Sequence, residues 1–407
     1  MSPYHETTSK ALRGSYRPTY FAVALIILFT ALAGGVAAST QGTPTPTPSA
    51  SSIPDPEQTP DGSAADPDSN GKQKRGSFIV APIPINSPTF GIGLIVAVGY
   101  VFKLDPEDTK SPASTIGAAG AFTDSGSRGL ILGGRLYFHE NKYQTAFAFG
   151  KGRANYDFYG IGRVPGTAGV PVEIRQSGAF IFGEFMRNFG KNIFVGPRYQ
   201  YRRLTAARDS RTTPGGFVIP ELDIISKTAA IGVHVQRDLR DQTFYTRKGS
   251  LFDFKADFFA KAVGSNRNYQ TYSMSYAGFR SLSEKRVLAY RAMACAATER
   301  APFYDLCLFG SSSNLRGYTV GEFQDRRMFA VQAEVRQELR YRLGIVGFAG
   351  IGGVAPEISK FRSDKLLPAA GVGLRFKLDK KNHINYRVDF GFGRSGPTLS
   401  MSVTEAF

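Results

Sequence analysis

Apolar and polar residues alternate along most of the chain beyond residue 76. In the segment 329–341, the odd positions are almost all apolar, whereas nearly all the even positions are polar or charged. The segments 225–238 and 383–392 repeat this pattern. A period of two places the two classes of residue on opposite faces of a β-strand. Since no convincing helical period appears beyond residue 40, the sequence predicts an all-β fold.

The beginning of the chain has the pattern of an export signal. Basic residues within positions 10–17 precede an apolar run at 20–33, and the small residues at 36–38 predict cleavage after Ala38. We therefore expect residues 1–38 to be a signal peptide. The alternative is an uncleaved anchor helix, although the run is shorter than the roughly 20 apolar residues that a membrane span needs.

The next segment, residues 39–76, has the composition of a tether. Pro, Ser, Thr, Asp and Gly dominate it, and Ile53 is its only large apolar residue. Such a segment cannot bury enough apolar surface to fold, and its Thr-Pro repeats favour extended polyproline conformations. We expect a disordered tether that is either an inert spacer or a segment reaching cell-wall material or a partner.

The alternation from residue 77 onward divides into about sixteen segments of strand length. If the first strand starts in the periplasm, the long gaps 154–172, 205–222 and 299–326 all lie outside the cell. Long outer loops, short periplasmic turns and an even number of strands are typical of outer-membrane barrels. The predicted strands are 77–85, 89–104, 113–124, 127–139, 142–154, 172–189, 191–205, 222–239, 249–262, 268–282, 286–299, 326–342, 344–356, 366–378, 382–393 and 397–407.

Alternation alone would also fit a soluble β-sandwich, and three observations favour a membrane barrel. The chain has an export signal, and its strands reach roughly ten residues or more, which a tilted strand needs to cross a bilayer. Their polar faces carry ionised groups, which suit a wet lumen better than a sandwich core. We predict a transmembrane antiparallel β-barrel over residues 77–407, in the outer membrane of a Gram-negative bacterium.

Composition adds little about chemistry but excludes several classes of site. The chain has 50 Lys and Arg against 33 Asp and Glu, a net charge of +17, which suits outer-membrane lipid or anionic solutes. Export argues against nucleic acid as a partner. The four His are scattered, two Cys cannot form a four-cysteine metal site, and no catalytic or phosphate-binding motif occurs. We expect no enzyme activity, no cofactor and no metal site.

A short motif lies in the longest predicted outer loop. The residues Leu315-Arg316-Gly317-Tyr318 precede the twelfth predicted strand. This resembles the sixth extracellular loop of the BamA/TamA family of outer-membrane barrels, also called the bacterial surface antigen family, in which an apolar residue precedes Arg-Gly-Tyr or Arg-Gly-Phe. The alternating ending up to Phe407 resembles the outer-membrane assembly signal.

The resemblance extends over about 77–407 and is best from 235 onward. The segment 237–241 (Arg-Asp-Leu-Arg-Asp) with Lys248-Gly249 looks like the family's Asp-x-Arg-Asp…Gly turn. The resemblance implies a role in outer-membrane biogenesis, protein insertion or translocation. It also implies outer-membrane lipid, the outer-membrane assembly machinery and an unknown periplasmic partner or cargo as partners.

The sequence departs from the family in three places. Only the predicted tether, and no POTRA domain, lies between the predicted signal and the barrel. The segment 348–350 reads Phe-Ala-Gly, where the family tends to have Phe-x-Asp, so a carboxylate is missing. Glu405 stands where the assembly signal prefers an apolar or aromatic residue.

The family resemblance also implies a role for the loop motif. Arg316 is expected to reach back into the lumen and pair with strand carboxylates, and alternation places Glu334 and Glu338 on the inner face. We expect Glu334 to be the partner, or Glu338 failing that, and expect one carboxylate to compensate for Gly350. Gly317 permits a tight turn at the loop tip. The alternative is a solvated loop arginine.

The two cysteines lie close enough in sequence to form a disulfide. Cys295 is predicted on the inner face of the eleventh strand, and Cys307 lies where the long loop begins. A bond in the oxidising periplasm would anchor the base of this loop, whereas two free thiols are the alternative.

The first predicted strand contains Pro82 and Pro84, which lack N–H donors on one edge. We expect that edge to face the last strand and to weaken the seam there. The alternative is that 77–85 is a lead-in outside the barrel wall.

Three functions remain open at this stage. The first is a relative of the assembly barrels without POTRA domains. The second is a passive pore with an anion preference, for which the predicted inward arginines are Arg336, Arg340, Arg375 and Arg387. The third, an outer-membrane lipid enzyme, lacks a catalytic constellation.

Overall fold

The computed structural model describes residues 76–87, 91–158, 172–208, 225–242, 244–310, 314–319, 322–379 and 383–407. The predicted signal peptide and, apart from Gly76, the predicted tether lie outside these residues. Within the described ranges, no helix has the length and apolar character to cross a membrane.

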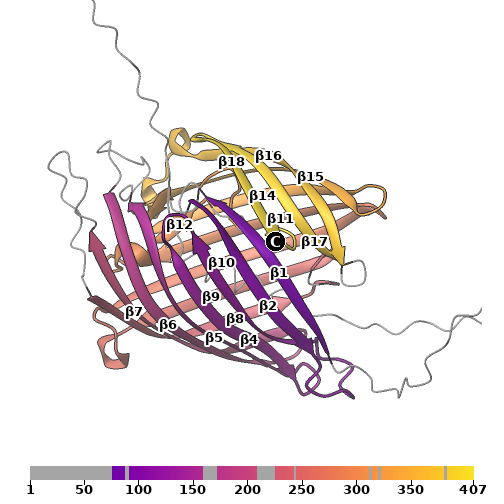
Figure 1. Ribbon diagram of the computed structural model, residues 1–407, viewed down its shortest axis with the longest axis horizontal. Coiled ribbons are helices and arrows are strands. Elements are labelled where there is room, and N and C mark those ends of the chain that lie inside the picture. Colours follow the sequence, from indigo (N-terminus) through magenta and orange to yellow (C-terminus); the bar gives the residue numbers. More distant parts are fainter. Residues whose placement is uncertain are drawn as a thin grey trace, which may run out of the picture.

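Sixteen antiparallel strands form one continuous sheet, in which each strand pairs with its neighbours along the chain (Figure 1). The prediction of an all-β fold with about sixteen strands is confirmed. These strands are β1 (Gly76–Ser87), β2 (Gly91–Phe102), β3 (Ser114–Thr123), β4 (Arg128–Phe138), β5 (Tyr143–Phe158), β6 (Val172–Asn188), β7 (Ile193–Arg208), β8 (Ile225–Asp238), β9 (Gly249–Phe259), β10 (Tyr269–Ser283), β11 (Arg286–Ala297), β14 (Arg327–Glu338), β15 (Leu343–Ala355), β16 (Leu367–Asp379), β17 (Ile384–Gly393) and β18 (Gly396–Val403).

Two shorter kinds of element lie in the connections. A two-stranded sheet, formed by β12 (Cys307–Phe309) and β13 (Phe323–Asp325), lies between β11 and β14. Within the described connections there are four single turns of 3-10 helix, which are η1 (Lys261–Val263), η2 (Phe303–Asp305), η3 (Ile358–Lys360) and η4 (Ser363–Lys365).

The sheet curls into a nearly closed barrel (Figure 1). Its hydrogen-bonded order begins at β1 and ends at β18, and these two edge strands lie next to each other. Strand β1 pairs with β2 over its whole length, from Gly76 opposite Phe102 to Ser87 opposite Gly91. The alternative in which 77–85 lies outside the wall is therefore wrong.

Strand β14 shows the two faces of the wall. Its inward residues Gln332, Glu334 and Arg336 are buried, whereas Val331 and Val335 on the outer face are 47% and 40% exposed. An apolar outer face with a polar lumen is the arrangement of an outer-membrane barrel. The sandwich alternative, which would need an apolar core between two sheets, does not describe this chain.

The connections differ between the two ends of the barrel. One end, called here the short-loop end, carries the turns 139–142, 189–192, 284–285 and 339–342. The opposite, long-loop end carries the connection 298–326 between β11 and β14, called here the lumen loop.

Two features of the structure depart from the prediction by more than a shift of strand boundaries. The β12–β13 hairpin was not predicted, because strands of three residues show no period. The last strand ends at Val403 and not at Phe407. Thr404 has a φ of 73°, which turns the chain out of the wall, and the Glu405 carboxylate finds its partners in the lumen. Phe407 is therefore not on an alternating strand.

Candidate functional site

The lumen loop folds back into the barrel and buries its motif there. Leu315, Arg316 and Tyr318 are at most 4% exposed. Apolar loop residues pack against inward residues of the wall and form one cluster, composed of Cys307, Phe309, Leu315, Tyr318, Phe323, Met328, Ala330, Val354, Leu367 and Ala369. Burial of these side chains holds the loop against the long-loop ends of β14, β15 and β16.

Arg316 is the polar centre of this contact. Its Nη2 donates to Glu334, and its Nη1 donates to Asp389 at 3.1 Å. Its backbone N and Nε both donate to the Gln332 side-chain oxygen, at 3.1 and 3.2 Å. The guanidinium carbon lies 3.8 Å from the ring centroid of Phe348, which adds a cation–π contact. Arg316 is therefore not solvated, so that alternative is wrong.

The carboxylates that hold Arg316 are shared with arginines of the wall. Arg336 Nε lies 2.6 Å from Glu334, while Arg375 and Arg387 lie 2.6 and 3.0 Å from Asp389. Each buried charge therefore meets at least one opposite charge, which offsets the cost of removing it from water. The loop joins an ion network that the wall strands β14, β16 and β17 already build.

Glycines allow the loop tip to approach the barrel wall closely. Gly317 has a φ of 105°, a left-handed conformation that favours glycine. A Cβ atom at Gly391 would lie 2.9 Å from both the N and the Cα atoms of Gly317. A Cβ atom at Gly350 would lie 2.5 Å from Leu315 Cδ1. The residue that departs from the family's Phe-x-Asp pattern thus leaves room for the apolar residue of the motif.

Only one of the two predicted partners of Arg316 contacts it. Glu334 contacts Arg316, whereas Glu338 lies 3.6 Å from Lys377 instead. Four residues along a strand span roughly 13 Å, so Glu338 is out of reach of a guanidinium that is level with Glu334. The prediction of Glu338 as an alternative partner was wrong.

Sequence reasoning missed Asp389 as the second carboxylate. Alternation places Asp389 on the polar face of β17, but the sequence does not tell which inward residue lies opposite the loop tip. The expectation that a single carboxylate compensates for Gly350 was therefore wrong, because Asp389 supplies the second negative charge.

Tyr318 completes the motif. Its hydroxyl donates to the Pro368 carbonyl oxygen at 2.6 Å and accepts from the Arg394 amide at 3.1 Å. Burial raises the pKa of the Tyr318 hydroxyl, which keeps it protonated and able to donate. Tyr318 thereby ties the loop to the start of β16 and to the β17–β18 turn.

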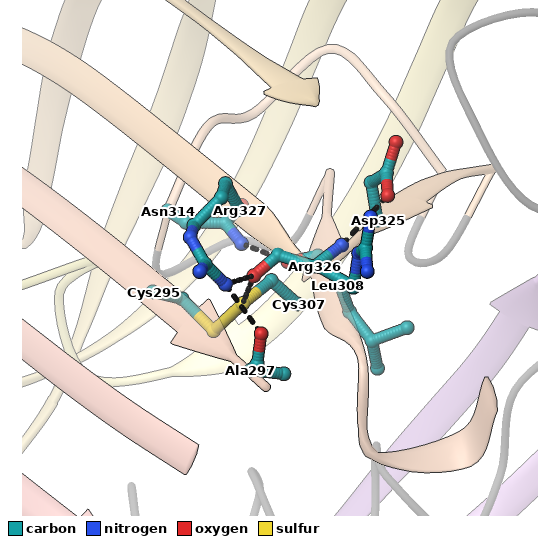
Figure 2. The surroundings of a disulfide bond; sticks show 8 residues. All are labelled: Cys295, Ala297, Cys307, Leu308, Asn314, Asp325, Arg326 and Arg327. Atoms are coloured by element: carbon teal, nitrogen blue, oxygen red, sulfur yellow. Dashed lines mark hydrogen bonds between the residues drawn. A yellow bond between two sulfur atoms is a disulfide. The ribbon is translucent and has the colours of Figure 1, made fainter. Parts of the chain in front are cut away.

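Cys295 and Cys307 form a disulfide at the base of the lumen loop, with Cα atoms 5.7 Å apart (Figure 2). Arg327 reaches across the same region and donates from Nη1 to the carbonyl oxygens of Ala297 and Arg326. The bond joins β12 to β11, so the loop leaves the wall from a fixed point.

A third attachment was not predicted. Arg202 on β7 donates to both oxygens of Asp305 on η2, at 2.6 and 2.7 Å, and the Tyr269 hydroxyl donates to the same carboxylate. The lumen loop is thus attached to β7 and β10 as well as to β14, β16 and β17.

The described part of the chain shows no metal-binding group of His, Cys, Asp and Glu side chains. His234, interpreted from the sequence as a polar lumen residue, lies between Glu184 and Asp253, with its two ring nitrogens 2.9 and 2.8 Å from their oxygens. The imidazole is thus held between two carboxylates of neighbouring wall strands.

A sequence profile described as the Omp85 superfamily domain matches residues 105–391, which include β3 to β16, most of β17 and the lumen loop. The chain belongs to the Omp85 superfamily. It is an outer-membrane β-barrel of the BamA type, which confirms the resemblance drawn from the loop motif. A comparison with curated proteins finds no match.

Solved structures support the fold. BamA from Haemophilus ducreyi lacking POTRA domains 1–3 superposes with a TM-score of 0.53 at 14% identity, covering 81% of this chain and 69% of that one. CdiB from Acinetobacter baumannii gives 0.53 at 12% identity, covering 80% and 58%. CdiB from Escherichia coli gives 0.54 at 12% identity, covering 81% and 62%. The chain thus spans less than two thirds of both CdiB structures.

Proposed function

We propose that this Omp85 barrel acts in outer-membrane biogenesis, as a protein that inserts or translocates other proteins at the outer membrane of a Gram-negative bacterium. The observation that carries the proposal is that Arg316 forms ion pairs with Glu334 and Asp389 inside the lumen. A loop held by buried ion pairs, a disulfide and a third attachment occupies space that a passive pore would leave to solute. The same observation argues against the anion-preferring pore.

The proposal includes the organisation of the chain. Residues 1–38 are removed as a signal peptide, residues 39–76 form a tether, and the barrel follows. In this arrangement the short-loop end faces the periplasm, where the tether joins β1, and the lumen loop belongs to the extracellular end. Outer-membrane lipid surrounds the wall, and the assembly machinery inserts the barrel. The proposal includes no catalytic step.

The test replaces Arg316 by Ala in the host bacterium and compares the outer-membrane proteomes by quantitative mass spectrometry. We expect one or a few outer-membrane or surface proteins to decrease while the barrel itself keeps its abundance. The matched control is Arg362→Ala, because Arg362 is exposed and pairs only with Asp364 among the ion pairs of the described residues.

Planar-bilayer recording of the purified protein tests the pore alternative. The proposal expects no large and steady open state for the intact barrel. An unchanged proteome in the Arg316 variant, together with a steady conductance of the intact protein, would contradict the proposed function and favour the pore.

A further inference from the structure

Five basic side chains lie on the outer face of the barrel wall, toward the long-loop end of the region β4 to β8 (Figure 1). All five are exposed. Each has the parity of the exposed apolar residues on its strand, as Arg128 has with Leu130 and Arg203 has with Tyr199. We call these side chains the basic belt, which consists of Arg128, Lys151, Arg153, Arg203 and Lys227.

The register of the strands arranges three of these bases in one row across the wall. Lys151 on β5 is opposite Ala179 on β6, Ala179 is opposite Arg203 on β7, and Arg203 is opposite Lys227 on β8. Neighbouring strands lie about 4.8 Å apart, so Lys151 and Arg203 are separated by roughly 10 Å at the backbone. The short Ala179 side chain leaves the outer surface between them low.

The other two bases form a second row, nearer the long-loop end. Arg153 on β5 is opposite Arg128 on β4, and Arg153 lies two residues beyond Lys151 on the same strand. Two residues span roughly 7 Å along a strand. Both rows are therefore within reach of one lipid headgroup that carries two anionic groups.

The basic belt lies at the edge of the apolar band of the outer face. On β6, the exposed Arg187 near the short-loop end is eight residues from Ala179, and Phe185 and Ile181 between them are exposed. Eight residues span roughly 26 Å, and a strand tilt of about 40° reduces this to roughly 20 Å along the membrane normal, against an apolar band of about 25 Å. Long basic side chains extend their charged ends the remaining distance into the headgroup region.

The belt is positively charged without compensation from the protein. None of its five side chains forms an ion pair with a carboxylate of the described residues. The lumen arginines differ, since Arg336 and Arg375 each lie 2.6 Å from a carboxylate oxygen of the wall. Arginine matches phosphate oxygens with its planar fork, and lysine adds a point charge. At a membrane surface, clustered bases of this kind bind lipid phosphates.

The opposite part of the wall has a different outer face. On β14 and β15, the outward positions at a similar distance from the short-loop turns are Phe329 and Ile351, which are apolar. The bases of the belt therefore distinguish β4 to β8 from β14 and β15, as expected for a lipid site on one side of the barrel.

We propose that the basic belt binds the phosphate groups of lipopolysaccharide, the phosphorylated glycolipid of the outer leaflet. Lys151, Arg203 and Lys227 bind one phosphate, and Arg128 and Arg153 bind the second. The occupant is this glycolipid because the long-loop end is proposed to be extracellular and because two rows of bases match two phosphates. The inference goes beyond the proposed function and shares only its orientation of the barrel. An unchanged outer-membrane proteome would contradict the proposed function and leave the binding result in place.

The experiment uses the full chain, purified in detergent micelles and checked for folding by heat-modifiable migration. Native mass spectrometry counts the lipids bound per barrel during titration with diphosphoryl lipid A, the anchor of lipopolysaccharide. The same titration is repeated with monophosphoryl lipid A and with phosphatidylglycerol. We expect one saturable adduct with diphosphoryl lipid A, and at least about tenfold weaker binding of the other two lipids.

Paired substitutions locate the site. The variant with Arg153→Gln and Arg203→Gln removes one base from each row and should weaken binding of diphosphoryl lipid A by at least about tenfold. The matched control has Arg187→Gln and Arg237→Gln, which remove two exposed bases from the outer face at the short-loop end. This control should bind the lipid as the wild type does.

A second pair keeps the test decisive if the first variant does not fold. The variant with Lys151→Gln and Lys227→Gln removes two bases of the first row and should weaken binding to a similar extent. A folded wild-type barrel without a saturable adduct, or with equal affinity for all three lipids, would overturn the proposal. Equal weakening in the belt variants and in the control would also overturn it, because binding would then follow total charge alone.

Discussion

Replacing Arg316 by Ala removes the group that holds the lumen loop to the wall. The side chain loses ion pairs to Glu334 and Asp389, its Nε bond to Gln332 and the contact with Phe348. The rest of the loop keeps the disulfide and the attachment of Asp305 to Arg202. The expected effect is therefore local opening of the loop tip, with the barrel still folded.

The free-energy cost of Arg316→Ala depends on which partners the two carboxylates keep. Removing one partner of a buried pair typically costs about 3–5 kcal/mol when the other charge is left alone. Here Glu334 retains Arg336, and Asp389 retains Arg375 and Arg387, so neither charge is left alone. We therefore expect about 2–3 kcal/mol for the opening of the loop tip. This corresponds to about a 30- to 160-fold change in the opening equilibrium.

Hydrogen–deuterium exchange of residues 314–319 measures this equilibrium. The Arg316→Ala variant should exchange faster in this segment by about that factor, while the strands β5 and β6 keep their protection. Arg316→Lys should lie in between, because an ammonium keeps the charge but not the planar fork. Arg362→Ala is the surface control. Unchanged exchange of residues 314–319 in the Arg316→Ala variant would refute the claim that this ion network holds the loop.

Three further predictions concern other contacts. Cys307→Ser should speed exchange of the β12–β13 hairpin by an amount equivalent to about 2–3 kcal/mol, because it removes the closure of a short ring, and equal exchange under oxidising conditions would contradict this. Gly391→Ala should displace the loop tip and speed exchange at 314–319, since its Cβ would meet Gly317 at 2.9 Å, whereas Gly347→Ala, with no atom within 4 Å, should have no effect there. Asp108 at the short-loop end has its pKa lowered from 3.8 to about 2: burial opposes the shift, but hydrogen bonds from Ser111, Glu140 and Lys110 to the carboxylate outweigh it. The stabilisation that the ionised Asp108 gives to the folded state is present above about pH 4 and is lost as the pH falls toward 2. The difference in thermal stability between the wild type and Asp108→Asn should therefore shrink over that range. A constant difference would refute the lowered pKa of Asp108.

The sequence contains most of the information about the wall. A period of two identifies strands of ten residues or more and assigns their faces, because one face must meet lipid and the other water. The same parity places Glu334 and Cys295 in the lumen. Loop lengths then set the two ends of the barrel. These signals are local and repeated in every strand. The predicted number and faces of the strands therefore stay correct even when each strand boundary is wrong by a few residues.

The contacts between the loop and the wall are not local, and parity does not give them. Asp389 is one of several inward polar residues, and only the three-dimensional path of the loop selects it as the partner of Arg316. The turn at Thr404 likewise depends on contacts between residues far apart in the sequence. A non-glycine residue takes a positive φ there because Glu405 finds Arg375 and Asn385 in the lumen, which lie 30 and 20 residues away in the sequence.

The seam between β1 and β18 should be the weakest part of the wall. The hydrogen-bonded order of the described strands does not continue from β18 to β1. Pro82 and Pro84 pair with β2 opposite Val96 and Leu94. Proline is tolerated in a strand where its missing N–H would point away from the partner, so we expect the nitrogens of both prolines to face the seam.

The alternation of amide directions in β18 gives a test within one strand. The Thr404 amide bonds to Asn385 on β17, so the amides of Thr398 and Ser400, which lie an even number of residues away, also point to β17. The amides of Leu399 and Met401 point to β1 instead. In lipid nanodiscs, the amides of Leu399 and Met401 should exchange at least about tenfold faster than those of Thr398 and Ser400. An amide without a ladder bond loses about 0.5–1.5 kcal/mol of stabilisation, and it can exchange without the strand pair having to open. Equal protection of the two sets would mean that β1 and β18 are paired in the membrane, and that the prolines do not weaken the seam.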